Sequence, residues 1–316
     1  LAVVFPGAGN IGGGGFMLAR KANGELIGID YREAAPGKAT RDMYLDAQGN
    51  PITKKSLDGA SASGIPGSVA GMIATHAYAK LSLAKLIEPA IELAEYGYVI
   101  TAREANGLNS QKANFLKNSS APSAFTQREW KAGDTLYQPE LAATLKRIQE
   151  KGLAGFYEGK TADLIVKEMG FSKGIISHED LKNYRAKYRT PLEFDYRGHH
   201  IISFAPPSSG GILIAQMLQM IQPFDVQKMG TNSPAAVSLM VEAQRRAYAD
   251  RAEHMGDPDF YKVPTKTLIS NEYAQQRMKD YENSPEYKDA VQRFYDSLKY
   301  KGDYGGGTIS HHNFQA

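Results

Sequence analysis

The first 31 residues alternate short apolar runs with glycine, a pattern that predicts a strand, a glycine loop and a hairpin. The apolar runs occupy residues 1–5, 16–20 and 26–31. Asn23-Gly24 separates the last two runs, and an Asn-Gly pair between apolar runs is typical of a tight β-hairpin turn. We therefore expect residues 16–31 to form two paired strands.

The hydrophobic period lengthens to that of a helix from residue 65 onward. Pro66-Gly67-Ser68 precedes apolar residues at Val69, Met72 and Ile73, which predicts a capped helix start. Apolar residues continue at helical spacing through residues 83–94. Pro89 is expected to interrupt this helix, because proline removes an intrahelical hydrogen bond.

Two further segments predict helices that face a core. Residues 139–151 carry an apolar face and stop at Gly152, and that face consists of Leu141, Leu145 and Ile148. A longer helix begins after Ser233-Pro234, which are residue types favoured at the N-cap and the first helical position, and it ends near Gly256. Its expected inward side chains are Val237, Met240, Val241 and Tyr248.

A second group of strands is expected between these helices. Residues 192–204 predict two strands about the turn Arg197-Gly198, and residues 212–221 predict a helix that follows Ser208-Ser209-Gly210-Gly211. Residues 106–135 are polar and are expected to form a surface excursion. The mixture of elements indicates an α+β or α/β protein.

The composition is that of an ordinary folded protein. The chain has 316 residues, of which 42% are hydrophobic and 22% charged, enough for one large domain or two modest ones. Its net charge of +3 comes from 37 basic and 34 acidic residues that are well mixed, so nucleic acid is not an expected partner. No stretch approaches the roughly 20 apolar residues of a membrane helix. The start at Leu1, without Met, is read as an interior point of a longer protein.

The absence of cysteine narrows the chemistry. Disulfides, thiolate metal sites and a cysteine nucleophile are excluded, so that a nucleophile must be Ser, Thr, Lys or a carboxylate. The seven His residues do not pair with carboxylates at the helical spacing of a metal site, and no metal is expected. His199-His200 is expected to be a strand pair whose side chains point to opposite faces.

The segment Gly7-Ala-Gly9-Asn-Ile-Gly12 fits the dinucleotide fingerprint, and Asp30 follows at the distance of a ribose-binding acid. That site needs a helix that begins within the glycine loop, because the helix amides hold the pyrophosphate. Here Gly13-Gly14-Gly15 and a hairpin pattern follow instead. The glycines therefore favour a tight structural loop, and no nucleotide cofactor is expected.

Two polar candidates have both a functional and a structural interpretation. Ser208 and Ser209 before a helix could supply a nucleophile or an oxyanion site, but an N-cap with a tight turn is the favoured interpretation. Arg32 follows a predicted strand, where a guanidinium could clamp a carboxylate through two parallel hydrogen bonds. The alternative for Arg32 is a local ion pair with Asp30 or Glu33, which sequence pattern alone favours.

Five segments together resemble the γ-glutamyltranspeptidase family, and they occur in the family's order and spacing. They are Gly9-Asn-Ile-Gly-Gly-Gly-Gly-Phe16, Asp30-Tyr-Arg-Glu-Ala-Ala-Pro36, Gly64-Ile-Pro-Gly-Ser-Val-Ala-Gly71, Pro206-Pro-Ser-Ser-Gly-Gly211, and Ala247-Tyr-Ala-Asp-Arg251 with Gly256-Asp-Pro-Asp-Phe260. The resemblance covers residues 1–275, interpreted as an incomplete large-subunit region. Residues 276–316 are interpreted as a divergent C-terminal tail.

The resemblance implies an α+β fold of the N-terminal-nucleophile hydrolase type, a four-layer αββα sandwich to which this chain contributes the large-subunit part. It implies a precursor that cuts itself into a large and a small subunit. The freed Thr of the small subunit attacks γ-glutamyl amides such as glutathione and passes the glutamyl group to water or to an acceptor amino acid or peptide. The implied compartment is the periplasm or the outside of the cell.

For individual residues, the resemblance implies that Arg32 binds the α-carboxylate of the γ-glutamyl group, which reverses the preference for a local ion pair. The nucleophilic Thr is expected on the small subunit and not in this chain. Thr308 is the one candidate here, and its neighbours, Gly307 and Ile309-Ser310, differ from those at the family's junction. The alternatives are an inactive remnant or binding protein of the same fold and, further removed, a dinucleotide-binding domain.

Overall fold

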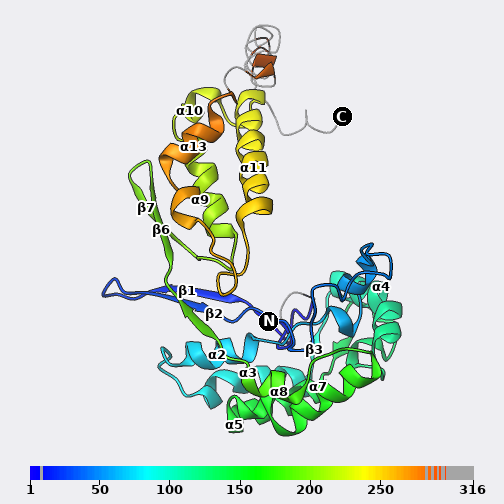
Figure 1. Ribbon diagram of the computed structural model, residues 1–316. Helices are drawn as coiled ribbons and strands as arrows, with labels where there is room; N and C mark the ends of the chain where they lie inside the picture. Colours follow the sequence, from blue (N-terminus) through cyan, green and yellow to red (C-terminus); the bar gives the residue numbers. More distant parts are fainter. Residues whose placement is uncertain (8–9, 282–283, 286–287, 290–291, 293–295, 297–316) are drawn as a thin grey trace, which may run out of the picture. The chain divides into compact units, whose positions relative to one another are not determined.

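The computed structural model describes residues 1–7, 10–281, 284–285, 288–289, 292 and 296 (Figure 1). Thr308, the candidate nucleophile, lies outside the described residues, as does most of the predicted tail. The chain divides into two compact units, Leu1–Arg189 and Thr190–Ala316. Helices are combined with small antiparallel sheets in the described residues, and this confirms the α+β class.

The first unit contains the predicted hairpin. Strands β1 (Phe16–Arg20) and β2 (Leu26–Asp30) pair antiparallel, and β5 (Lys187–Arg189) pairs with the other side of β2. Gly24 occupies the turn with φ +90°, a conformation that glycine adopts without steric cost. The three-stranded sheet therefore joins residues near the start of the unit to residues at its end.

The strand predicted over residues 1–5 is wrong. This segment forms a turn in which the Phe5 amide donates to the Leu1 carbonyl oxygen at 2.8 Å. The turn places Val3, which is 3% exposed, in the main core of the unit. The apolar run thus reflects burial of a turn and not strand pairing.

Helices are the main regular elements of the first unit. They are α1 (Thr53–Leu57), α2 (Ser68–His76), α3 (Leu83–Tyr96), α4 (Ala102–Asn118), α5 (Pro139–Lys151), α6 (Ala154–Tyr157), α7 (Gly159–Phe171) and α8 (His178–Asn183), with 3₁₀ turns at Ala60–Ala62 and Ala124–Thr126. The short strands β3 (Tyr98–Val99) and β4 (Thr135–Leu136) pair with each other. The predicted helix start at Ser68 and the stop at Gly152 are confirmed.

Pro89 does not interrupt α3, which continues to Tyr96. Ile91 and Ala94, which follow the proline, are buried in the main core with Leu145 and Ile148 of α5. Because the second half of the helix packs against α5, burial compensates for the hydrogen bond that proline removes.

The polar segment of residues 106–135 is more ordered than predicted. Residues 106–118 belong to α4, which begins at a capping box formed by Thr101 and Glu104, and residues 124–126 form a 3₁₀ turn. Trp130 is 4% exposed, and its Nε1 donates to the Phe125 carbonyl oxygen at 2.8 Å. A small separate core therefore lies beneath this segment.

The second unit combines a hairpin with helices. Strands β6 (Leu192–Tyr196) and β7 (His199–Ser203) pair about Arg197 and Gly198, both at positive φ, as predicted. The helices are α9 (Gly210–Ile221), α10 (Val226–Met229), α11 (Pro234–His254), α12 (Thr265–Leu268) and α13 (Asn271–Met278). Met278 and Tyr281, which lie in the predicted tail, are buried in one of its cores.

The face of α11 predicted to point inward is wrong. Its four residues are exposed, Val237 by 39%, Met240 by 43%, Val241 by 53% and Tyr248 by 58%. The buried face instead contains Leu239, three alanines and the charged Arg246 and Asp250. Because periodicity gives most weight to large apolar side chains, a packing face built from alanine and paired charges was missed.

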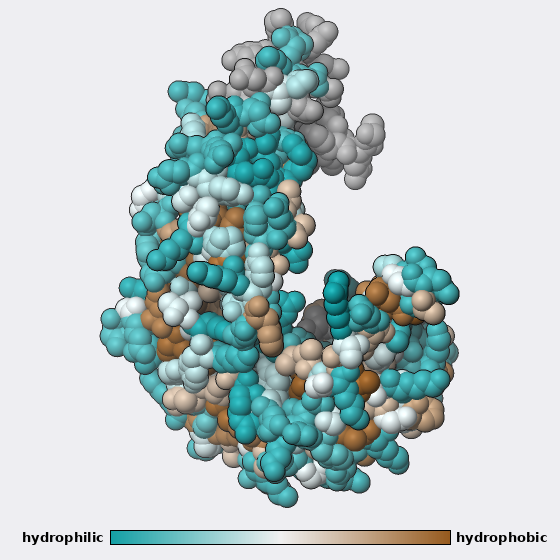
Figure 2. All heavy atoms as spheres, in the orientation of Figure 1, coloured by the Kyte–Doolittle hydropathy of each residue, from teal (hydrophilic) through white to brown (hydrophobic). Residues whose placement is uncertain are grey.

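Hydrophilic side chains cover most of the visible surface of each unit, with smaller hydrophobic areas between them (Figure 2). No helix in the described part of the chain is both long enough and apolar enough to cross a membrane.

Candidate functional site

Arg32 follows directly after β2, and its backbone is held on both sides. Its amide donates to Asp30 Oδ1 at 3.1 Å, and its carbonyl oxygen accepts from the Tyr184 hydroxyl at 2.7 Å. The residue is exposed. Hydrogen bonds to both of its peptide groups therefore hold the backbone from which the Arg32 side chain projects.

Asp30 lies at the end of β2 and is 6% exposed. Its second carboxylate oxygen, Oδ2, pairs with Nε of Arg189 in β5 at 3.1 Å. A buried carboxylate needs such partners, because an unpaired charge in the interior is costly. Asp30 thus links the end of β2 to β5 and fixes the first peptide group of Arg32.

Tyr31 packs against several glycines, and this explains why the sequence has glycine there. A Cβ atom built at Gly67 would lie 2.0 Å from the Tyr31 carbonyl oxygen, and one at Gly71 would lie 2.2 Å from the ring. At Gly14 and Gly15 the corresponding distances to Tyr31 are 2.6 and 2.8 Å. Any side chain at these positions would displace the strand end that carries Arg32.

The glycine loop also caps the N-terminus of α2 with a backbone carbonyl oxygen. The Gly13 carbonyl oxygen accepts from the amides of Gly67 at 2.8 Å and Ser68 at 2.9 Å. No side chain caps α2, so the predicted cap is supplied by the loop backbone instead. The amides of the N-cap residue Gly67 and of the first helical residue Ser68 are thereby hydrogen-bonded within the protein.

This arrangement contradicts the dinucleotide interpretation. In the described part of the loop, residues 10–15, no helix begins, and β1 follows at Phe16. The helix start that the fingerprint requires is therefore missing from residues 10–15. The expectation of a tight structural loop is confirmed.

A stacked pair of tyrosines contacts the backbone of Arg32 and of the segment before α2. The rings of Tyr157 and Tyr184 lie 5.8 Å apart with an angle of 11° between their planes. The Tyr157 hydroxyl donates to the Pro66 carbonyl oxygen at 2.8 Å and accepts from the Ala70 amide at 3.2 Å. Burial raises the pKa of Tyr157 to about 12 and raises that of Tyr184 as well. Both hydroxyls therefore stay protonated and able to donate.

The predicted N-cap role is wrong for Ser209, whereas Ser208 accepts a hydrogen bond from the amide of the first residue of α9. Ser209 precedes α9 in a helical conformation and makes no capping hydrogen bond. Its Oγ accepts from Arg251 Nε at 3.1 Å, while Ser208 Oγ accepts from the Gly210 amide at 3.4 Å. Gly211 is required for packing, since a Cβ there would lie 2.3 Å from the Phe204 carbonyl oxygen.

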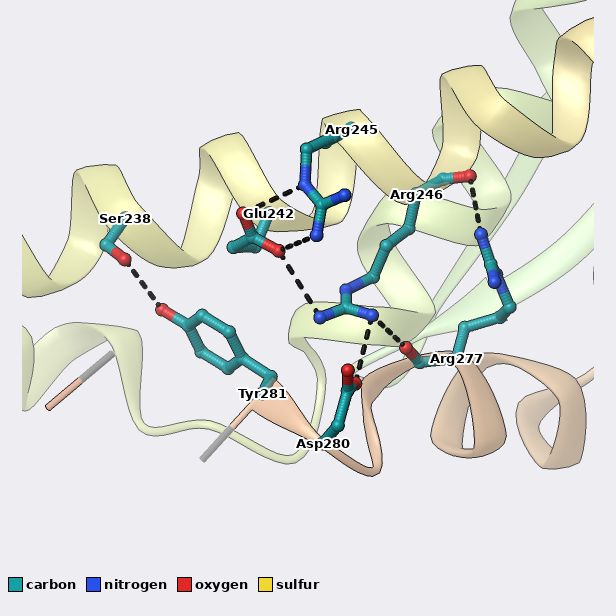
Figure 3. A network of polar contacts seen from close by, with 7 residues as sticks. All are labelled: Ser238, Glu242, Arg245, Arg246, Arg277, Asp280 and Tyr281. Carbon is teal, nitrogen blue, oxygen red and sulfur yellow. Dashed lines mark hydrogen bonds and ion pairs between the residues drawn. The ribbon is translucent and has the colours of Figure 1, made fainter. Parts of the chain in front are cut away.

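The second unit contains a polar network around Arg246 of α11 (Figure 3). Arg246 pairs with Glu242 at 3.3 Å and with Asp280 at 3.0 Å, and it donates to the Arg277 carbonyl oxygen at 2.8 Å. Arg277 also pairs with the buried Asp250 at 3.1 Å. These contacts attach α13 to α11, so Asp250 of the Ala247–Arg251 motif has a structural explanation.

The histidines do not assemble a metal site in the described residues, where no group of three or more His, Asp or Glu side chains is arranged to hold an ion. His200 lies between two carboxylates on the β6–β7 hairpin, 2.9 Å from Asp195 and 2.9 Å from Glu193. These contacts raise the pKa of His200 above its usual value. His311 and His312 lie outside the described residues.

The comparison with known proteins decides the family. A family model described as gamma-glutamyltranspeptidase matches residues 1–312. The chain belongs to the γ-glutamyltranspeptidase family. The match extends into residues 276–312, the segment interpreted from sequence as a divergent tail.

Individual relatives agree with this assignment. The glutathione hydrolase proenzyme of Escherichia coli K12 is 48% identical over 278 residues, which are 87% of this chain and 48% of the relative. The crystal structure of Helicobacter pylori γ-glutamyltranspeptidase superposes with a TM-score of 0.84 at 44% identity, and the match covers 88% of this chain and 81% of that one. An acylase ACY 1 proenzyme of Pseudomonas sp. strain V22 is 36% identical over 286 residues, which are 88% of this chain and 51% of the relative. The chain spans about half the length of the curated relatives it matches.

The sequence analysis proposed Arg32 and named Asp30 as a neighbour, but it identified neither Tyr184 nor Arg189, which hold the backbone around them. Tyr184 is 152 residues away from Arg32, and Arg189 is 159 residues away from Asp30. The glycine positions were the one usable signal, because they indicated a close approach of backbones without saying to what.

Proposed function

We propose that this chain is the large-subunit portion of a γ-glutamyltransferase or glutathione hydrolase that acts with a small subunit from the same precursor. The single observation that carries this proposal is the 48% identity to a glutathione hydrolase proenzyme of which this chain matches about half. The word proenzyme describes a precursor that is processed, in keeping with two subunits.

In this proposal Arg32 binds the α-carboxylate of the γ-glutamyl group. Support comes from its exposed place at the end of β2 and from the two hydrogen bonds that hold its peptide groups. A guanidinium offers parallel donors that match a carboxylate, and its binding strength rises when the backbone beneath it is already ordered.

The chemistry would come from the N-terminal Thr of the small subunit. Its hydroxyl oxygen attacks the γ-carbonyl carbon, and its own α-amine takes the hydroxyl proton. The C–N bond breaks, the proton passes to the departing amine, and a γ-glutamyl ester remains. Water or the amine of an acceptor amino acid or peptide then attacks this ester, which releases glutamate or a new γ-glutamyl amide and restores the Thr.

The acylase relative makes substrate identity a separate question from family. At 36% identity a protein of the same family carries the name acylase, so membership alone does not define the acyl group. A carboxylate clamp at Arg32 would favour γ-glutamyl groups over acyl groups that lack an α-carboxylate.

Intact-mass analysis and a turnover assay test the proposal together. The enzyme purified from its natural precursor should contain a second, smaller polypeptide and should cleave a γ-glutamyl anilide, whereas residues 1–316 expressed alone should not. A preparation that contains a single chain and still turns over would contradict the two-subunit proposal. Two chains without any turnover would favour the inactive alternative.

A further inference from the structure

The hydroxyls of two stacked tyrosines, Tyr184 and Tyr157, donate hydrogen bonds to two backbone segments, one of which contains Arg32. The Tyr184 hydroxyl reaches the Arg32 carbonyl oxygen at 2.7 Å, and the Tyr157 hydroxyl reaches the Pro66 carbonyl oxygen at 2.8 Å. Both side chains are nearly completely buried, Tyr184 being 7% exposed and Tyr157 4%. The two phenols therefore join the end of β2 to the start of α2.

The packing around these hydroxyls leaves little room for movement. A Cβ atom at Gly67 would lie 2.2 Å from the Tyr184 oxygen and 2.0 Å from the Tyr31 carbonyl oxygen. The ring of Tyr184 is held in turn by its stacking on Tyr157. From this closely packed position the Tyr184 hydroxyl donates to the Arg32 carbonyl oxygen.

The second restraint on Arg32 comes from the opposite side of the residue. Its amide donates to Asp30, whose carboxylate is anchored by Arg189. With the preceding peptide held by Asp30 and the following one by Tyr184, the direction in which the Arg32 side chain leaves the backbone is set. A guanidinium placed in this way binds a carboxylate without first losing backbone entropy.

We propose that Tyr184 is a positioning residue for substrate binding, which acts through the backbone of Arg32 and is itself held in place by Tyr157. The inference rests on the proposed role of Arg32 in binding the α-carboxylate of the γ-glutamyl group. Tyr184 does not touch the substrate in this proposal. Its hydroxyl affects the Michaelis constant and leaves the chemical step unchanged.

The test is Tyr184→Phe in the processed two-subunit enzyme, because phenylalanine keeps the stacked ring and removes only the hydroxyl. The KM for a γ-glutamyl anilide should rise about 3- to 10-fold, the effect of losing one net hydrogen bond, while kcat stays within about twofold. Tyr157→Phe, which removes the contacts to Pro66 and Ala70, should raise KM by a smaller factor.

Tyr44→Phe is the matched control. The Tyr44 hydroxyl donates to the Ser61 carbonyl oxygen at 2.9 Å in the same unit, so this variant loses the same kind of bond away from Arg32. It should lower the melting temperature about as much as Tyr184→Phe and leave KM unchanged. If Tyr184→Phe, Tyr44→Phe and the unchanged enzyme have equal KM values and only the melting temperature differs, Tyr184 has a structural role and the proposal is overturned.

A double-mutant cycle separates this proposal from the proposed function. If Tyr184 acts through Arg32, Tyr184→Phe should change KM by less than about twofold in an Arg32→Ala background. A full additional increase there, or a fall in kcat without a change in KM, would overturn the positioning role. If Arg32→Ala itself leaves KM unchanged, it is the carboxylate-binding function that fails.

Discussion

Gly71 of α2 lies directly against the ring of Tyr31, so closely that a Cβ atom on the glycine would be 2.2 Å from ring atom Cγ. The contact places the first turns of α2 beside the strand end that precedes Arg32. A helical glycine normally weakens a helix relative to alanine. Here the missing side chain is what allows helix and strand to approach.

We predict that Gly71→Ala destabilises the protein by about 1 to 3 kcal/mol, because the added methyl group must displace either the ring or the helix. Gly107→Ala in α4 is the matched control, since no atom lies within 4 Å of a Cβ built there. That variant should gain about 0.5 to 1 kcal/mol from helix propensity. Thermal melts of the processed enzyme measure whether each variant is less or more stable than the unchanged protein. A stabilised Gly71→Ala variant would contradict the close contact between Gly71 and the Tyr31 ring.

If Arg32 binds the α-carboxylate as proposed, Arg32→Ala should raise the KM for a γ-glutamyl anilide sharply, because a charge-assisted bidentate pair is worth roughly 2 to 4 kcal/mol. Arg32→Lys should recover only part of this loss, since an ammonium group cannot reproduce the fork of the guanidinium.

The control for these variants is Arg41→Ala, which removes the same charge from a side chain that is 96% exposed. Its KM should equal that of the unchanged enzyme. Steady-state kinetics that give Arg32→Ala and Arg41→Ala the same KM would remove Arg32 from the substrate site.

The stability of the protein should fall as the pH rises above about 10, and Tyr157 should account for part of that fall. Burial raises the pKa of its hydroxyl from 10.0 to about 12. Between these values the unfolded chain releases the proton and the folded chain keeps it, so folding becomes less favourable with rising pH.

Tyr157→Phe should flatten this part of the stability curve, measured as the urea midpoint at several pH values from about 9 to about 12. Tyr96→Phe, at a residue that is 72% exposed, serves as the control and should keep the original slope. An unchanged slope in Tyr157→Phe would show that its hydroxyl ionises equally in both states.

The polypeptide of residues 1–316 should neither cleave itself at Gly307-Thr308 nor hydrolyse γ-glutamyl anilides. In that polypeptide eight residues follow Thr308, too few to supply the oxyanion donors and the glutamyl pocket that acyl transfer requires. Activity should appear when a small subunit is supplied. Scission before Thr308 seen by mass spectrometry, with turnover that Thr308→Ala abolishes, would make Thr308 the nucleophile.

Local sequence signals predicted the parts of this fold that depend on neighbouring residues. The hairpin about Asn23-Gly24, the turn at Arg197-Gly198 and the helix start at Ser233-Pro234 each follow from the conformational preferences of two residues. The tight glycine loop was predicted for the same reason. Such preferences depend on a few neighbouring residues, so they can be predicted without knowing how the rest of the chain folds.

Features decided by distant contacts could not be predicted in this way. The inward face of α11 depends on which neighbours its alanines meet, and Ser209 is used by Arg251 instead of by its own helix. The candidate site likewise combines a residue proposed from a local motif with contacts between distant residues. Arg32 was proposed from its motif, whereas the contact of its carbonyl oxygen with Tyr184 joins residues 152 positions apart and could not be predicted from the neighbouring sequence.

The separation of those partners has a consequence for the order in which the protein matures. Arg32 is synthesised early, but Tyr184 and Arg189, which hold the strand end around it, are among the last residues of the first unit to be made. Loops of this length must close before the distant contacts form. A nascent chain that has not yet reached residue 189 contains Arg32 without the residues that hold its backbone, so this backbone geometry forms only once the first unit is complete.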